Sequence, residues 1–403
     1  MNRFTTGLCA AALTLAVLCA PAAAQMSDDV VRIGVLTDLS GPYADSGGRG
    51  SVAAAEMAAK DFGGKVRGKP VEIISADHQN KPDVASSLAR RWYDVDRVDA
   101  IVDLPVTAIA LAVQAVAKEK NRTVMITAAA TSDLTAKTCS PVSSHWTDDT
   151  HALTAGTARA VFERGGKSWY FITVDHAFGH ALQKEATTVV ESLGGKVVGT
   201  SRHPINTADY SSFLLQAQSS GADVVAFASV GDDFTKAVKQ ADEFGLTGGR
   251  QTLTGFLVYV TDIKGLGLPV ARGLTFSSAF YWDQNDAARA FAKRFQDRTG
   301  AMPTKNQALI YAAVTHYLKA VDKAGTDEAV AANAAMRSLP VAFFDHPATL
   351  RADGRLLYDP VLYRAKDPAA SKGPWDLYEV LRTIPQGEAF LPMNPACAPN
   401  GRE

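Results

Sequence analysis

The residues of this sequence that could carry catalytic or metal chemistry do not complete a known motif. His176 and His180 are four positions apart, a spacing that can place two metal ligands on one helix face. Gly179 stands between them and no third ligand is evident, so loop or helix-cap histidines are the better interpretation. Gly166-Lys167-Ser168 matches the end of a phosphate loop, but Val161 replaces the earlier glycine and the triplet precedes a predicted strand.

Two adjacent acids, Asp232 and Asp233, are a possible carboxylate pair. Neighbouring residues in a loop seldom converge on one substrate, so a helix cap and a surface carboxylate fit them better. The sequence has no G-x-S-x-G elbow and no H-E-x-x-H motif. We therefore expect a protein that is not an enzyme and holds no metal or cofactor, with a secreted α/β enzyme as the less favoured alternative.

Small, hydroxylated and aromatic residues recur in the loops that follow predicted strands. These loops are 37–48, 104–107 and 128–132 in the first half and 175–179, 229–233 and 255–259 in the second. Open α/β sheets bind ligands outside the carboxyl ends of their strands. Small residues let an anion reach helix N-termini, and aromatic rings form flat apolar walls. A structural role in a turn or helix cap can explain any one of these residues. The same kind of loop occurs in both halves of the sequence, however, and this recurrence favours a binding site.

The elements that must position these loops alternate between short apolar runs and segments of helical periodicity. Strands are predicted at 30–36, 71–75, 100–103 and 123–127, and again at 168–173, 196–202, 224–228 and 251–254. Helices are predicted at 51–62, 82–94 and 109–120, and again at 178–193, 210–219 and 234–244. The stretch 77–83, leading to Ser86-Ser87, resembles 202–209, leading to Ser211-Ser212, a weak internal repeat of strand, polar loop, Asp N-cap and helix. The pattern predicts an α/β fold of two Rossmann-like lobes.

The order of elements changes after Arg272, where the chain must return to complete both lobes. We predict lobe 1 at 28–145 plus 278–343, lobe 2 at 146–277 plus 344–390, and a C-terminal tail at 391–403. Crossovers near 143–148, 276–281 and 341–347 would form a three-segment hinge that permits closure.

The first 24 residues have the pattern of a signal peptide, with a positive start, an apolar run at 8–20 and cleavage expected after Ala24. The run is shorter than the ~20 residues that span a bilayer. Cleavage leaves Cys139 and Cys397, for which an oxidising compartment favours a disulfide over two separate buried thiols.

Composition excludes several other classes of protein. The 403 residues carry 41 Lys and Arg against 42 Asp and Glu, and 47% of them are apolar, as in ordinary globular proteins. No basic block appears, so no nucleic-acid partner is expected.

Three stretches resemble one known family, and together they span nearly all of the mature chain. The segment 31–43, followed by Gly47, resembles the opening of the branched-chain amino-acid (Leu/Ile/Val-binding) type of periplasmic solute-binding protein of ABC transporters. The segments 128–135 and 175–179 resemble two further signatures. The resemblance implies a type I periplasmic-binding fold that closes on a small solute in the periplasm and delivers it to permease subunits in the inner membrane. We expect a monomer.

The resemblance and the loops together give the candidate ligand-binding residues. They are Tyr43, Ser46, Pro105, Val106, Thr107, Ala128, Ala129, Thr131, Trp146, Phe178, Gly231, Asp232 and Phe256. The resemblance implies that Ala129 and Thr131 hold a ligand carboxylate and that Phe178 closes over the ligand.

One departure from the family bears on the solute. Amino-acid binders hold the α-ammonium with an acid in the loop after the last strand of lobe 2, and the residues 255–258 contain none. An unpaired ammonium in a closed cleft would cost several kcal/mol. The hypothesis is an aromatic or other carboxylate without an α-amino group, since 139–141 and 145–146 resemble relatives that bind such acids. Asp232 can still replace the missing acid, so amino-acid binding stays open, as does a ligand sensor for a membrane receptor.

Overall fold

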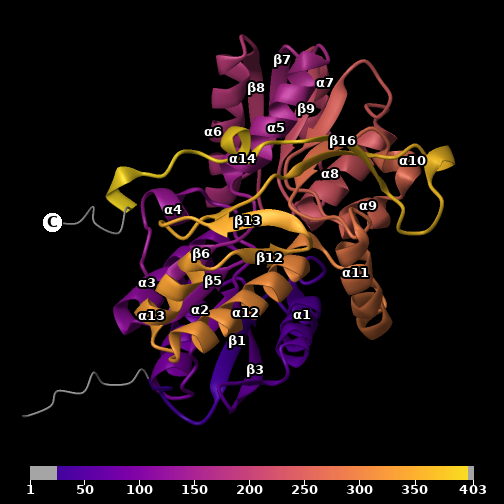
Figure 1. Cartoon of the computed structure of the whole chain (residues 1–403). Helices are drawn as coiled ribbons and strands as arrows, with labels where there is room; N and C mark the ends of the chain where they lie inside the picture. The colour runs from indigo at the N-terminus through magenta and orange to yellow at the C-terminus, as the bar shows by residue number, and fades with distance from the viewer. Residues whose placement is uncertain (1–24, 398–403) are drawn as a thin grey trace, which may run out of the picture.

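The computed structural model describes residues 25–397 (Figure 1). The predicted signal peptide with its cleavage site and residues 398–403 lie outside the described residues. Two parallel sheets with helices packed around them form the two ends of the molecule, the first low and the second high in Figure 1. The predicted α/β class with two similar units is confirmed.

The first sheet has the strand order β2-β3-β1-β4-β5-β6. Its strands are β1 (Val31–Thr37), β2 (Lys65–Val66), β3 (Lys69–Asp77), β4 (Ala100–Asp103), β5 (Thr123–Ile126) and β6 (Ser143–His145). All neighbours pair in parallel except β2, which is antiparallel to β3. The intervening helices are α1 (Gly48–Asp61), α2 (Pro82–Asp94), α3 (Thr107–Lys120) and the short α4 (Asp133–Ala136).

The second sheet has the strand order β10-β9-β7-β8, all parallel. Its strands are β7 (Ser168–Val174), β8 (Lys196–His203), β9 (Val224–Ala228) and β10 (Thr252–Gly255). Its helices are α5 (Thr150–Glu163), α6 (Ala177–Ser192), α7 (Ser211–Ser219), α8 (Asp232–Glu243), α9 (Val260–Leu266) and α10 (Leu268–Ala271). Strands β8, β7, β9 and β10 repeat the order of β3, β1, β4 and β5, so the two sheets share one topology.

The last third of the chain adds helices to the first unit and two small antiparallel sheets. Helices α11 (Asp286–Thr299), α12 (Lys305–Ala324) and α13 (Ala329–Ser338) pack on the first unit, where α1 contacts both α11 and α12. Strands β11 (Thr275–Ser278), β15 (Val361–Ala365) and β16 (Tyr378–Thr383) form a small antiparallel sheet, and β12 (Val341–Phe343), β13 (His346–Leu350) and β14 (Leu356–Leu357) form another. Short helices η1 (Pro368–Ala370), α14 (Gln386–Ala389) and η2 (Pro395–Cys397) complete the chain.

The parallel sheets are apolar on both faces because helices cover both. In β4, Ala100 and Val102 join one core cluster, whereas Ile101 joins the cluster on the opposite face. In β9, Val225 and Phe227 likewise face away from Ala226. This double burial produces the short, uninterrupted apolar runs seen in the sequence.

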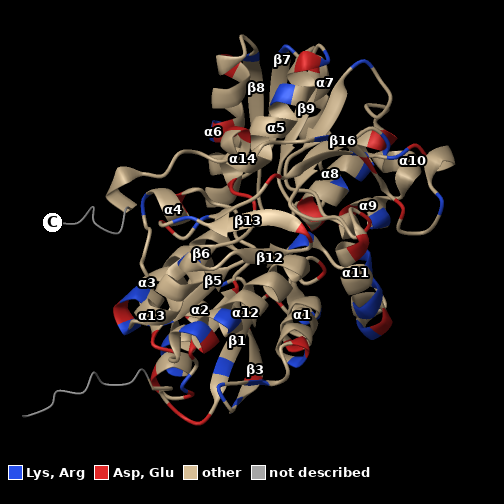
Figure 2. Cartoon of the chain, in the orientation of Figure 1, with Lys and Arg blue, Asp and Glu red and all other residues tan. Residues whose placement is uncertain are grey.

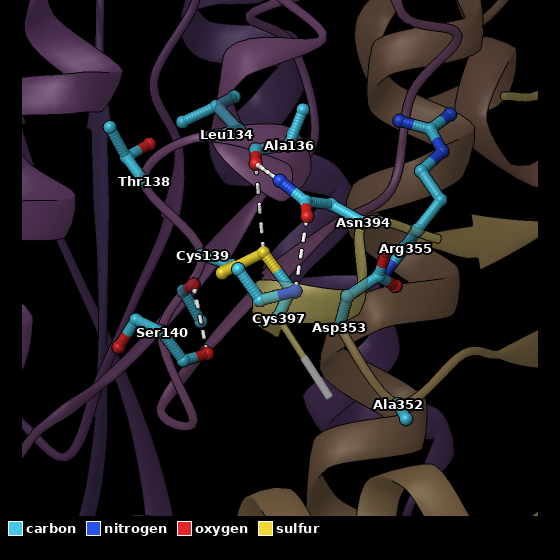
Figure 3. The surroundings of a disulfide bond; sticks show 12 residues. Leu134, Ala136, Thr138, Cys139, Ser140, Ala352, Asp353, Arg355, Asn394 and Cys397 are labelled. Atoms are coloured by element: carbon cyan, nitrogen blue, oxygen red, sulfur yellow. Dashed lines mark hydrogen bonds between the residues drawn. A yellow bond between two sulfur atoms is a disulfide. The ribbon is translucent and has the colours of Figure 1, made fainter. Parts of the chain in front are cut away.

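A disulfide joins Cys139 to Cys397 across 258 positions, which confirms the predicted bridge (Figure 3). Next to it, the side-chain amide of Asn394 donates to the carbonyl oxygen of Ala136. The end of the chain, which comes from the small antiparallel sheet by way of α14, is therefore fixed to the loop after α4.

Charged residues of both signs are interspersed along the helices, as on α11 (Figure 2). There Arg289 pairs with Asp286, and Lys293 pairs with Asp297. Within residues 25–397, the structure contains no helix both long enough and apolar enough to cross a bilayer.

Candidate functional site

A cavity of about 270 Å³ lies where loops from the carboxyl ends of the two parallel sheets meet. The first sheet supplies the loops after β1, β3, β4 and β5, and the second supplies those after β7, β8, β9 and β10. A hollow of about 320 Å³ beside the disulfide is larger. Its lining residues come from 139–141, from α13, from 352–353 and from 396–397, and none directly follows the carboxyl end of a strand in the two parallel sheets, so we place the candidate site at the cavity between the sheets.

Seven of the predicted site residues line this cavity. They are Tyr43, Ser46, Pro105, Val106, Thr107, Ala128 and Phe178. Four of the seven come from the loops after β1 and β4, whereas Thr107 and Phe178 reach the cavity from the first turns of α3 and α6.

The other six predicted residues lie elsewhere. Trp146 is fully buried in the core, and its indole N–H donates to Ser144 Oγ at 2.8 Å. Phe256 is also fully buried, with its ring stacked near those of Trp169 and Phe171. Their placement makes both rings part of the protein core.

Ala129 and Thr131 alternate with the lining residues Ala128 and Ala130, so they lie beside the cavity and not on its wall. The Thr131 hydroxyl accepts from the backbone N–H of Asp133 at 3.4 Å. The carbonyl oxygen of Ala129 is bound to His145 Nε2 at 2.7 Å.

Gly231 and Asp232 line a second hollow, of about 430 Å³, which shares Ser46 with the cavity. A Cβ on Gly231 would lie 3.1 Å from the carbonyl oxygen of Pro42, and its φ of +64° lies in the left-handed region. Glycine there permits a close approach between the loops of the two sheets. The Asp232 carboxylate lies 3.6 Å from Lys236 Nζ at the surface.

Ten lining residues were not among the predicted ones. They are Asn80, Pro82, Ala108, Ala130, His176, Ala177, Ile205, Val230, Leu257 and Tyr259. All of them lie in or beside loops at the carboxyl ends of strands. The rule that ligands of open α/β sheets bind at these ends therefore predicts them as well. Three of them, Asn80, Pro82 and Ile205, lie within the weak internal repeat of the sequence.

The wall of the cavity carries no formal charge. Within the described chain, no Asp, Glu, Lys or Arg contributes to it. Burial lowers the pKa of His176, which favours the neutral imidazole, and burial raises the pKa values of the Tyr43 and Tyr259 phenols. A charged solute would therefore find no side chain of opposite charge on this wall.

Two helix N-termini bring partial positive charge to the cavity wall, which has no charged side chains. Helices α3 and α6 begin at the wall, with Val106 and His176 as their N-cap residues. As far as the structure is described, neither N-cap residue makes a side-chain capping bond, so the first-turn amides of these helices have no such partner. Amides at a helix N-terminus favour a negatively charged group.

Tyr259 links the two sides of the cavity. Its hydroxyl accepts a hydrogen bond from Asn306 Nδ2 at 3.0 Å, and both side chains are buried. Tyr259 follows β10 of the second sheet, whereas Asn306 belongs to α12, which packs against α1 of the first unit. The bond therefore holds together the two units that form the cavity.

A buried polar network supports the loop after β5. His145 lies between Ala129 and Arg355, whose Nη1 is 2.7 Å from His145 Nδ1. Because guanidinium only donates, Nδ1 accepts, and Nε2–H donates to the carbonyl oxygen of Ala129. Arg355 also donates to the carbonyl oxygen of Thr147, so the segments around 145 and 355 are joined where the chain passes between the sheets.

Comparisons with known proteins agree with this architecture. The profile of the family described as "periplasmic binding protein" matches residues 30–373. A periplasmic binding protein from Burkholderia mallei is 43% identical, with a TM-score of 0.88 over 90% of this chain and 96% of its own. A branched-chain amino-acid ABC transporter periplasmic ligand-binding protein from Burkholderia xenovorans is 40% identical, with a TM-score of 0.82 over 90% of this chain and 97% of its own.

More distant relatives share the fold. A solute-binding protein of an ABC transporter from Rhodopseudomonas palustris, in complex with benzoate, has a TM-score of 0.79 at 20% identity over 88% of this chain and 96% of its own. A curated Leu/Ile/Val-binding protein homolog from Brucella melitensis is 28% identical over 260 residues, or 64% of this chain. The match spans 66% of that relative's length. The chain belongs to the periplasmic binding protein family and has its type I fold.

Proposed function

We propose that this chain is the periplasmic solute-binding component of an ABC transporter, and that it captures a small carboxylate without an α-amino group, most simply an aromatic one. The observation that carries the solute class is the uncharged cavity wall, with two helix N-termini at its edge. An ammonium group would lose its hydration there without gaining a counter-ion. A carboxylate would meet the first-turn amides of α3 and α6.

The cavity is suited in size and lining to one small ring. Its volume of about 270 Å³ is near the lower end of ligand pockets, and the rings of Tyr43, Phe178 and Tyr259 contribute to its wall. Aromatic side chains pack against a flat apolar ligand in offset or edge-to-face geometry. The benzoate complex of the R. palustris protein shows that this fold can enclose such a solute.

We propose that capture proceeds by closure of the predicted lobes, 28–145 plus 278–343 and 146–277 plus 344–390, without turnover of the solute. The solute shifts the protein toward the closed form only by its greater affinity for that form. Inner-membrane permease subunits would then recognise the closed lobes, with the protein acting as a monomer in the periplasm after cleavage following Ala24.

Calorimetry of the wild-type protein with benzoate, cinnamate and leucine tests the solute class, together with native mass spectrometry of any co-purified molecule. We expect benzoate or cinnamate to bind and leucine to give no heat of binding. Tight leucine binding with silent aromatic acids would contradict the proposal.

Amino-acid binding is the second candidate, and the hollow beside Ser46 favours it. Asp232 and Asp262 line this hollow, which adjoins the main cavity. An amino acid placed across the two compartments would bring its ammonium group to these carboxylates. In that case leucine binds to wild type and the variant Asp262→Asn loses that affinity, whereas the aromatic-acid proposal predicts no effect of Asp262→Asn on benzoate.

A further inference from the structure

A turn of the first unit, 38–43, reaches across to the second unit and is held by its own hydrogen bonds. The Asp38 carboxylate accepts from the backbone N–H groups of Gly41 at 2.7 Å and Tyr43 at 3.0 Å. The side-chain amide of Asn80 donates to the same carboxylate at 2.8 Å. A Cβ on Gly41 would lie 2.7 Å from both carboxylate oxygens, so the turn needs glycine there. The conformation of the turn is therefore fixed by contacts within the first unit.

The tip of this turn packs on the second unit. Tyr43 belongs to an apolar cluster whose other buried members, apart from Ala130, come from the second unit. The carbonyl oxygen of Pro42 lies against Gly231, the N-cap residue of α8. A Cβ added to Gly231 would be 3.1 Å from that oxygen and 3.7 Å from Cδ1 of Tyr43. The first of these distances is shorter than the optimal separation of nonbonded heavy atoms, about 3.5 Å, so glycine lets the two units approach this closely.

The backbone at this position also favours glycine, and a second glycine separates the two reasons. Gly231 has a φ of +64° and a ψ of −136°, a combination essentially restricted to glycine. Gly267, between α9 and α10 of the second unit, has a φ of +75° and a ψ of +150° and falls under the same restriction. A Cβ there would meet Cδ of Pro269 at 3.7 Å, an ordinary contact within the second unit. Gly267 therefore shares the backbone strain of Gly231 but makes no contact with the first unit.

We propose that the contact between Gly231 and Pro42 forms when the two units close on the solute, and that glycine is needed there because any side chain holds the units apart. This inference rests on the proposed function, since it requires the two units to close. It gives Gly231 a role in positioning the units and not in contact with the solute, because the residue lines the adjoining hollow and not the cavity. Tyr43 lines the cavity and also belongs to the tip of the turn, so it joins solute contact to closure.

The test compares Gly231→Ala with the matched control Gly267→Ala by calorimetry, using whichever of benzoate, cinnamate or leucine binds wild type most tightly. Both substitutions strain the backbone, so both should lower the midpoint of urea unfolding. Gly231→Ala should also weaken solute binding by at least about fivefold, because overpacking the contact between the units opposes the closed form. The control should bind the solute within about twofold of wild type, because its side chain meets no residue of the first unit.

A larger side chain tests directly whether the units are held apart. Spin labels at Lys60→Cys and Glu243→Cys, exposed positions on α1 and α8, report the separation of the two units. The distance between the labels should shorten when solute is added to wild type and to Gly267→Trp, but not when it is added to Gly231→Trp.

Two results would overturn the inference and leave the proposed function standing. One is an affinity of Gly231→Ala equal to that of Gly267→Ala, and the other is a Gly231→Trp variant that closes as wild type does. If wild type binds none of the three compounds, the proposed function falls and the inference falls with it.

Discussion

Replacing Tyr259 by phenylalanine removes one hydroxyl from the cavity wall. The substitution tests whether the hydrogen bond between Tyr259 and Asn306 stabilises a closed form of the two units. The hydroxyl is bound to Asn306 Nδ2 at 3.0 Å, and Asn306 Oδ1 already has no partner among the described residues. Without the tyrosine hydroxyl, the fully buried Asn306 amide would make no side-chain hydrogen bond in the closed form. In an open form, water would satisfy the same amide. The substitution should therefore destabilise the closed form relative to the open one.

The size of this effect follows from the burial of the pair. Leaving a buried donor unpaired costs about 1–3 kcal/mol. If the solute binds the closed form and the free protein is mostly open, the loss appears in full in the dissociation constant. Benzoate affinity should then fall about 5- to 150-fold.

Calorimetry with benzoate on three proteins separates this explanation from a direct contact of the hydroxyl with the solute. The proteins are wild type, Tyr259→Phe, and Tyr259→Phe combined with Asn306→Leu, which also removes the stranded amide. We expect the double variant to recover a large part of the lost affinity. A Kd within about twofold of wild type for Tyr259→Phe would refute the reasoning, because no unpaired-amide penalty would then exist. Failure of the double variant to recover would assign the hydroxyl to the solute instead.

Three further predictions concern stability and pH. Lys305→Met leaves the buried Asp148 carboxylate without its ion-pair partner and should lower the free energy of unfolding, measured with urea at neutral pH, by about 3–5 kcal/mol. Adding Asp148→Asn should recover most of this loss. A loss below about 1 kcal/mol would contradict the prediction. Burial works to raise the pKa of Asp148, but the pair with Lys305 holds it below its usual value, so this contribution is present at neutral pH and is lost as the pH falls below about 4. Replacing Cys139 and Cys397 together by Ser should lower the free energy of unfolding by about 2–5 kcal/mol. Benzoate affinity should stay within about threefold of wild type. Loss of benzoate binding in a folded variant would show that the disulfide supports the binding site. Because burial lowers the pKa of His176, benzoate affinity should be flat between about pH 7 and 9, and a tenfold change there would show that a titrating group contacts the solute.

Strand and helix order was predictable because parallel sheets bury both faces and so leave short apolar runs in the sequence. Helix α5 was not predicted, and the reason is its burial: ten of its 14 residues are buried, so its sequence lacks the one-sided apolar stripe of a surface helix. At Gly156 a Cβ would lie 2.1 Å from Cδ1 of Ile384, which shows how closely the end of the chain packs on this helix. Strand β16 pairs with β15 across the long segment 366–377, a pairing that local patterns do not reveal. Strands β12 and β13 are joined by a tight turn at Phe344 and Asp345, both at positive φ without a glycine that would mark a hairpin.

The loops that line the candidate cavity were predictable from the sequence, but the side chains on its wall were predictable only in part. The rule that ligands bind at strand ends found both sides of the cavity. Within a loop, however, a ring that lines a cavity and one that packs in the core have the same sequence signal. Phe178 reaches the cavity wall, whereas Trp146 and Phe256 turn into the core, and only the packing around each ring decides between these positions.

The two units share one topology but bring different chemistry to the cavity, and this difference implies an order of events. The first unit provides Ser46 and Thr107, whose hydroxyl groups can replace water around a solute before closure. Beside His176 at the start of α6, the loops of the second provide mainly the apolar side chains of Phe178, Ile205 and Leu257, and the hydroxyl of Tyr259 is already bound to Asn306. Apolar groups gain free energy only when water leaves, which happens on closure. The first unit should therefore supply most of the polar side chains that recognise the solute, and the second, apart from the amides of α6, the differential affinity that drives the closed form.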